Sequence, residues 1–229
     1  MRRPYSLLLS VLIVATLGAL AACSGPDSPD RSPEDRLAAA KQDLDDARFV
    51  GFTLTGEDLP DTTVLESAHG TGTHAPSFTG EVQVKRGLSF TAPVVAIDGL
   101  VYLKLPFAGW STIQPADYGA PDPAALMDTD TGISSLITSA ADLTVGGTAR
   151  DGSEVLTEIS GTLPGKSVHA LFPSASADQP FDVTFTLTED DRLHGVTITG
   201  KFYGPEHGDS RYVIELDTSA APVRITAPE

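Results

Sequence analysis

Hydrophobic and polar residues alternate with a period of two through most of the chain beyond residue 49. Such alternation is typical of strands that bury one face. The apolar positions that carry it are Val50, Phe52, Leu54, Phe78, Val82, Val84, Val101, Leu103, Leu105, Val155, Ile159, Val183, Phe185, Leu187, Val196, Ile198, Ile214 and Leu216. Turn signals separate the alternating segments, for example DG at 98–99 and RDGS at 150–153. The pattern predicts about ten strands in one antiparallel sheet.

A helical period replaces the alternation between Pro33 and about residue 48. Ser32 fits an N-cap and Pro33 the first helical position, while Leu37, Ala40 and Leu44 would share one face. Shorter helices are predicted at 123–127, 132–137 and 164–172. Helices this few and short form no layer of their own, so they must cap one face of a curved sheet. The fold class that follows is α+β.

The first 23 residues, MRRPYSLLLSVLIVATLGALAAC, have the plan of a secretory signal. Arg2 and Arg3 precede an apolar run (7–17) that is too short and wrongly flanked for a spanning helix, and a retained anchor helix is the weaker alternative. The last four residues, Leu20 to Cys23, resemble a bacterial lipobox. The resemblance implies cleavage before Cys23 and a diacylglycerol thioether on its sulfur. Cys23 is the only cysteine, so it has no disulfide partner.

Three segments are therefore expected: a lipoprotein signal peptide at 1–22, the acylated cysteine with a flexible tether at 23–32, and one folded domain at 33–229. The formal net charge of −16 argues against a nucleic-acid-binding protein, which needs a clustered basic face. An acidic domain is also repelled by an anionic membrane, so the lipid on Cys23 has to hold it there.

Motifs that would carry chemistry are weak. The sequence contains no G-x-S-x-G or S-x-x-K motif. In HGTGTH (69–74) the two histidines would point to opposite faces of a strand, so we interpret them as solvated rather than as metal ligands. DTDTG (128–132) lacks the spacing of a calcium loop and fits a helix-capping turn better, and the acids at 182 and 189–191 fit a solvated hairpin. We predict no enzyme, no metal site and no cofactor.

A longer stretch, from FTGEVQVKRG (78–87) to DLTVGGTA (142–149), resembles the actinobacterial LppX/LprA/LprF/LprG lipoprotein family. The shared features, in chain order, are DG-x-x-Y at 98–102, Trp110, Asp122-Pro123, D-x-x-TG-x-x-x-L at 128–136, and the closing YVIELDTSAAPVRITAP at 212–228. The resemblance covers roughly residues 33–228. It implies a single large curved antiparallel sheet, a half-barrel, with short helices covering its concave face, as in lipid carriers of the LolA/LolB type.

The same resemblance implies an apolar cavity for acyl chains between sheet and helices. The apolar residues that we expect to line it are Phe78, Val82, Val84, Phe90, Val94, Val101, Leu103, Ile133, Leu136 and Ile137. From patterning alone each of these residues fits a packed core better than a cavity wall, and it is the resemblance that favours the cavity for the set. Aromatic residues make up only 7% of the chain, which mildly favours a hollow with a smooth aliphatic wall.

The function expected from the resemblance is binding of a multi-acylated lipid or lipoglycan and its transport across the periplasm-like space. The chain would be a monomer anchored through Cys23 to the outer face of the cytoplasmic membrane, with a membrane lipid exporter as a further partner and no nucleic acid. The alternative is an envelope scaffold or adhesion module with a solid core, which would bind a protein partner through its acidic surface.

Overall fold

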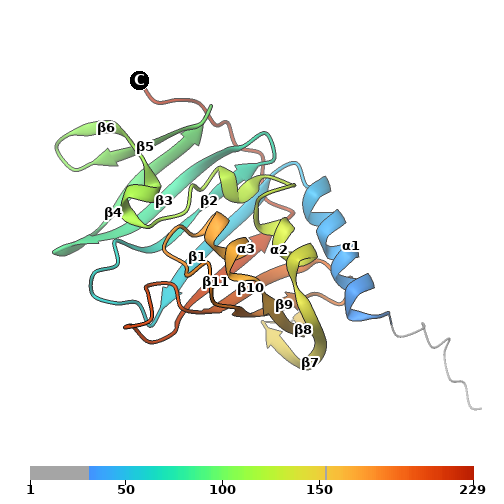
Figure 1. Ribbon diagram of the computed structural model, residues 1–229. Coiled ribbons are helices and arrows are strands. Elements are labelled where there is room, and N and C mark those ends of the chain that lie inside the picture. The colour runs from blue at the N-terminus through green and yellow to red at the C-terminus, as the bar shows by residue number, and fades with distance from the viewer. Residues whose placement is uncertain (1–30, 153) are drawn as a thin grey trace, which may run out of the picture. The chain divides into compact units, whose positions relative to one another are not determined.

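Eleven antiparallel strands form one sheet in the computed structural model, which describes residues 31–152 and 154–229 (Figure 1). Their order is β6-β5-β4-β3-β2-β1-β11-β10-β9-β8-β7, so two meanders meet where β1 pairs with β11. The strands are β1 Val50–Glu57, β2 Leu65–Thr73, β3 Ser77–Arg86, β4 Leu88–Ile97, β5 Leu100–Leu105, β6 Gly109–Ile113, β7 Ala141–Asp151, β8 Glu154–Leu163, β9 Phe181–Leu187, β10 Leu193–Gly200 and β11 Ser210–Asp217. The predicted antiparallel sheet is confirmed, with eleven strands instead of about ten.

Three short α-helices and two 3₁₀ turns accompany the sheet. They are α1 Pro33–Asp46, η1 Pro115–Tyr118, η2 Ala125–Met127, α2 Ile133–Ser139 and α3 Gly165–Leu171. The Ser32 hydroxyl oxygen accepts a hydrogen bond from the Asp35 N–H at 3.1 Å, so the predicted N-cap of α1 is confirmed. The predicted helix at 123–127 is a single 3₁₀ turn instead, and η1 was not predicted. Within the described residues no helix is long and apolar enough to cross a membrane.

The helices cover one part of the sheet more tightly than the other. Helix α1 contacts α2, β7 and β10, and α2 contacts α3. Strands β7–β11 with α1–α3 form what we call the solid half. Strands β1–β6 are covered by the thinner segment that contains η1 and η2, and η2 contacts β3. This second part is called the hollow half below.

Aromatic side chains fill the solid half. Phe172, Phe181, Phe185, Phe202 and Tyr212 are each at most 1% exposed. The Tyr212 ring stacks on Phe172 at 5.1 Å and meets Phe202 edge to face at 4.8 Å between ring centroids. Burial raises the pKa of the Tyr212 hydroxyl, which forms a hydrogen bond with the Tyr203 hydroxyl.

One acid at the β9–β10 turn holds α1 to the solid half. Asp191 is 5% exposed, and its carboxylate accepts hydrogen bonds from Arg36 Nε at 2.6 Å and lies 3.1 Å from an Arg31 guanidinium nitrogen. The prediction that the acids at 189–191 form a solvated face is therefore wrong for Asp191. A buried carboxylate persists only where cations compensate it, and the two arginines do so here.

The signal peptide and Cys23 lie outside the described residues. The boundaries at residues 22 and 32 stay predictions. Residues 31–229 form one compact unit with its own core.

Candidate functional site

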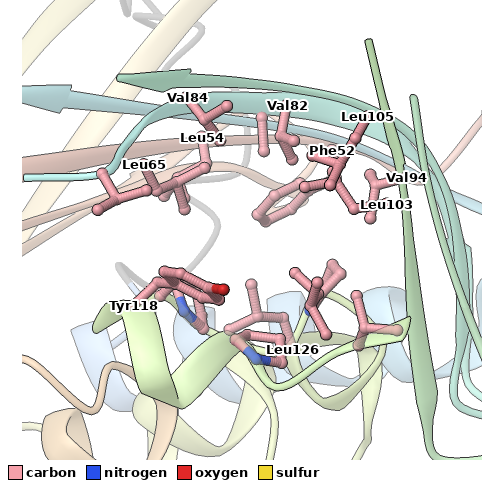
Figure 2. Close-up of a pocket in the computed structure, with 18 of the residues that line it drawn as sticks. Phe52, Leu54, Leu65, Val82, Val84, Val94, Leu103, Leu105, Tyr118 and Leu126 are labelled. Atoms are coloured by element: carbon pink, nitrogen blue, oxygen red, sulfur yellow. The ribbon is translucent and has the colours of Figure 1, made fainter. Parts of the chain in front are cut away.

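A cavity lies between strands β1–β5 and the segment that follows β6 (Figure 2). The cavity has a volume of about 110 Å³ and is partly open to solvent. The residues that line it are Phe52, Leu54, Val64, Leu65, Ala68, Val82, Val84, Phe90, Val94, Val101, Leu103, Leu105, Ile113, Pro115, Tyr118, Ala120, Pro121, Pro123 and Leu126. In Figure 2 the sheet residues point toward Tyr118 and Leu126 across an open space.

The lining has almost no polar character. None of the lining residues carries a charge, and the Tyr118 hydroxyl is their only polar side-chain group. A single water needs roughly 10–15 Å³ of such space together with two to four polar partners. The cavity therefore has room for more than one water but offers water few hydrogen bonds, so an apolar ligand is favoured over solvent.

Small residues in the sheet leave this space open. Val82 lies mid-strand on β3 and pairs across the sheet with Ala68 on β2 and Ala92 on β4. Alanine side chains extend only a short way from the sheet, so these three neighbouring residues leave space between the sheet and the covering segment. At the closed end, a side chain on Gly72 would collide with Met127, so glycine there lets the covering segment approach the sheet.

The covering segment, residues 114–132, is fastened at its far end by His74. One His74 ring nitrogen lies 2.6 Å from the Met127 carbonyl oxygen and the other lies 2.8 Å from that of Leu44. Both partners are backbone carbonyl oxygens, so the ring links the covering segment to the end of α1. The interpretation of HGTGTH as two solvated histidines is confirmed for His69, whose side chain is 62% exposed, and wrong for His74.

Two further contacts hold the same segment. The Lys41 ammonium on α1 donates to the Thr129 carbonyl oxygen at 3.1 Å. Asp128 accepts from the Thr131 N–H at 2.8 Å and from the Thr131 hydroxyl at 2.9 Å, and these bonds hold the pKa of the Asp128 carboxyl below its usual value. A turn at 128–132 is thus present, but the prediction that it caps a helix is wrong, because α2 begins after Gly132 without a side-chain cap. No group of three or more potential metal ligands occurs among the described residues.

Six of the ten residues expected to line the cavity do so, namely Val82, Val84, Phe90, Val94, Val101 and Leu103. The structure places the other four in the packed core instead. Phe78 is fully buried and meets Phe52 edge to face at 5.9 Å between centroids. Ile133, Leu136 and Ile137 face inward from α2 in the solid half, where Ile133 borders only a small space of about 10 Å³.

Most of the lining residues that sequence reasoning missed come from β1, β2 and the covering segment. Phe52 and Leu54 carried the right alternation, but their place opposite the cover depends on the pairing of β1 with both β2 and β11. Pro115, Tyr118 and Pro121 lie in a proline-rich connection with neither helical nor strand period, and Pro123 begins the short helix predicted after it. Three prolines close together were the available signal, because a stiff apolar connection is suited to cover a face without filling it.

Comparison with known proteins gives relatives along most of the chain. The LppX_LprAFG lipoprotein family model matches residues 32–226. The lipoarabinomannan carrier protein LprG of Mycobacterium tuberculosis is 27% identical over 194 residues, which cover 82% of this chain and 80% of the relative. LprG of Mycolicibacterium smegmatis is 26% identical over 233 residues, covering 94% and 93% respectively.

Two solved structures share the fold. LprF from Mycobacterium bovis superposes with a TM-score of 0.67 at 17% identity, covering 85% of this chain and 96% of LprF. LppX from Mycobacterium tuberculosis gives 0.60 at 19% identity, covering 85% of this chain and all of LppX. The curved eleven-stranded sheet, the helical cover and the family match over residues 32–226 agree, and the chain belongs to the LppX_LprAFG lipoprotein family.

Proposed function

We propose that this lipoprotein binds the acyl chains of an envelope lipid or lipoglycan in the cavity of the hollow half and carries them between membranes of the envelope. The observation that carries the proposal is the cavity itself, which is lined by apolar side chains without a single charge. Relatives that are named lipoarabinomannan carriers support a multi-acylated ligand. The chain would act by binding, without catalysis.

The energetics explain why a carrier is needed. Moving one sixteen-carbon chain through water costs on the order of 12 kcal/mol, at about 0.8 kcal/mol for each methylene. A cavity that keeps the chain out of water lowers this barrier. With no charged group in the lining, recognition would depend on the number and volume of acyl chains, and polar head groups would stay near the mouth.

A multi-acylated ligand needs more room than the cavity now offers. The covering segment is the part that would yield, because it is thinner than the solid half and its attachments concentrate at Lys41 and His74. We propose that acyl chains enter by lifting this segment from the sheet while the solid half keeps its packing.

Attachment to the membrane would depend on Cys23. Two or three acyl chains on one residue make anchoring effectively permanent, whereas one chain anchors only reversibly. We place the chain on the outer face of the cytoplasmic membrane, as a monomer, with a membrane lipid exporter as a partner. The variant Cys23→Ser should accumulate as uncleaved precursor or leave the membrane fraction, and its retention after salt and carbonate washing would refute the anchor.

Thermal melts with and without lipid test the proposal. An envelope lipid extract at about 100 times its dissociation constant should add about 2.7 kcal/mol of stability, because it binds only the folded chain. The same extract after deacylation is the control and should add nothing. The alternative of a solid scaffold that binds a protein through its acidic surface predicts no stabilisation by either extract.

A further inference from the structure

Two hairpin turns beside the cavity carry exposed apolar side chains. Leu88, the first residue of β4 at the β3–β4 turn, is 82% exposed, and Phe107 in the β5–β6 turn is completely exposed. The two turns lie at the same end of the sheet, because each follows an odd-numbered strand of one antiparallel meander. We call this pair of turns the rim.

The rim continues the cavity surface outward. On β4, Val94 and Phe90 line the cavity, and Leu88 is two residues further along the same face. On β5, Leu103 and Leu105 line it, and Phe107 follows in the turn. The lining residues that are only partly buried, and so border the mouth, are Val64, Phe90, Leu105, Ile113, Tyr118 and Ala120. A continuous row of apolar side chains, called the apolar track below, therefore runs from the cavity past its mouth to Leu88 and Phe107, the two apolar tips of the rim.

The backbone conformation at Phe107 is unfavourable for a phenylalanine. Its φ is +66°, a left-handed conformation that glycine or asparagine adopts more readily than a bulky residue does. A solvent-exposed aromatic ring at a strained turn contributes nothing visible to the fold. Its position suits a contact outside the molecule.

Charge at the rim has the opposite sign to the rest of the chain. Residues 82–113 contain Lys85, Arg86 and Lys104 and a single acid, Asp98, whose turn is at the other end of the hairpins. Acids also lie at this end of the sheet, namely Asp58 and Asp61 in the β1–β2 connection, Glu66 on β2 and Asp117 on η1, and Asp61 is 3.2 Å from the Lys85 ammonium. The Lys104 ammonium lies 5.8 Å from the Trp110 ring centroid, a pairing of cation and indole that suits a membrane interface.

We propose that the rim docks on an anionic bilayer surface, with Leu88 and Phe107 inserted among the lipids, so that the cavity mouth meets the membrane. Lys85 and Lys104 would attract the head groups, while the two apolar tips enter the acyl boundary. Acyl chains would then pass along the apolar track without crossing water. This inference rests on the proposed function, for which it supplies the entry route.

The only tryptophan of the chain, Trp110, lies on β6 next to the rim and reports docking without a label. The complete chain is reconstituted into phosphatidylglycerol vesicles whose acyl chains are brominated, and quenching of Trp110 fluorescence is measured. We expect clear quenching in these vesicles and much less in brominated phosphatidylcholine vesicles. Chain that is pre-loaded with brominated lipid and placed in unbrominated vesicles gives the contribution of lipid inside the cavity, which is subtracted.

The double variant Leu88→Asp/Phe107→Asp should reduce the ratio of docked to undocked protein by about 10-fold or more, because two large apolar side chains no longer enter the bilayer. Val145→Asp is the matched control, since Val145 is 48% exposed on β7 at the opposite edge of the sheet and should leave quenching unchanged. Equal quenching of the double variant and the wild type would overturn the proposal. So would concentration-dependent dimerisation that buries the rim without any quenching by vesicles.

Lipid binding is scored separately, by extracting the same preparations and measuring bound lipid by mass spectrometry. Bound lipid without Trp110 quenching would overturn docking and leave the proposed function intact. Quenching without bound lipid would support docking and contradict the carrier.

Discussion

Val82 on β3 distinguishes a hollow interior from a solid one. It is 9% exposed, lines the cavity and has alanines as cross-strand neighbours on both sides. In Val82→Trp the indole should occupy space otherwise available to an acyl chain. We expect lipid loading to fall several-fold while the free energy of unfolding changes by less than about 1 kcal/mol. A melting curve and a lipid-loading assay on the same preparation measure both.

Val196 on β10 is the matched control, because it is the same residue on the same type of strand with different neighbours. Phe185 and Ile214 flank it in the solid half. Val196→Trp should overpack and cost roughly 1–3 kcal/mol or more. Equal destabilisation by the two substitutions would show that Val82 faces no usable space, and unchanged loading in Val82→Trp would remove this residue from the binding site.

Asp128 gives the covering segment a dependence on acid pH. Its pKa is lowered in the folded chain, chiefly by the hydrogen bonds from Thr131, so its ionised form stabilises the fold at every pH above the unfolded pKa, near 3.9. That contribution is lost as the pH falls through the lower, folded pKa. Asp128→Asn keeps an acceptor oxygen and loses the charge, so it should be less stable than the wild type by about 0.5–1 kcal/mol at pH 7.

Melting curves between pH 7 and pH 3 check this prediction. The difference between wild type and Asp128→Asn should shrink below about pH 4. Asp130→Asn, two residues along the same turn, should show no such convergence, because the Asp130 carboxylate accepts none of the bonds from Thr131. A constant difference for Asp128→Asn down to pH 3 would contradict the account.

Among the elements, the covering segment is the one whose mobility the carrier requires. His74 ties it to both the β2–β3 turn and the end of α1. His74→Ala removes the ring donor from the Met127 carbonyl oxygen and leaves the Leu44 carbonyl oxygen with the Ala47 N–H alone, which should cost about 1–3 kcal/mol. Amide hydrogen exchange should accelerate in residues 114–132, and bulkier lipids should load more readily. His69→Ala, at an exposed position on β2, should change neither.

No change in exchange or loading for His74→Ala would contradict the role of this segment as the movable part. Accelerated exchange throughout the solid half would contradict this role as well. The His74 hydrogen bonds fasten only the covering segment, so their loss should leave the amides of β7–β11 protected.

The elements that sequence could predict are those whose own residues carry a period. Alternation located β1, β3, β5 and β8–β11, and the capping pattern located α1. β2 (LESAHGTGT) and β7 (ADLTVGGTARD) are rich in small and polar residues and show no clear alternation. Each is a strand because a neighbouring strand supplies its hydrogen bonds, and β7 is exposed along nearly all its length. Tertiary pairing of this kind leaves no local trace.

For the molecule as a whole, the question that patterning left open was whether the interior is packed or hollow. Both descriptions hold, for different halves of one sheet. Phe172 and Phe202 come from the connections before β9 and β11 and fill the solid half, whereas the proline-rich cover leaves space above β3 and β4. An inward-facing valine on β3 and one on β10 look alike in sequence, because the difference lies in what meets them from the other side.

The family match, the cavity and the cover all bear on one claim, that this chain carries acylated lipid. Extraction of the purified complete chain, followed by mass spectrometry, tests it most directly when the bound lipid is counted per protein, apart from any lipid attached to Cys23. We predict multi-acylated lipid in near-stoichiometric amount with the wild type and several-fold less with Val82→Trp. Wild-type chain that never carries such lipid, or carries as much as Val82→Trp does, would contradict the account.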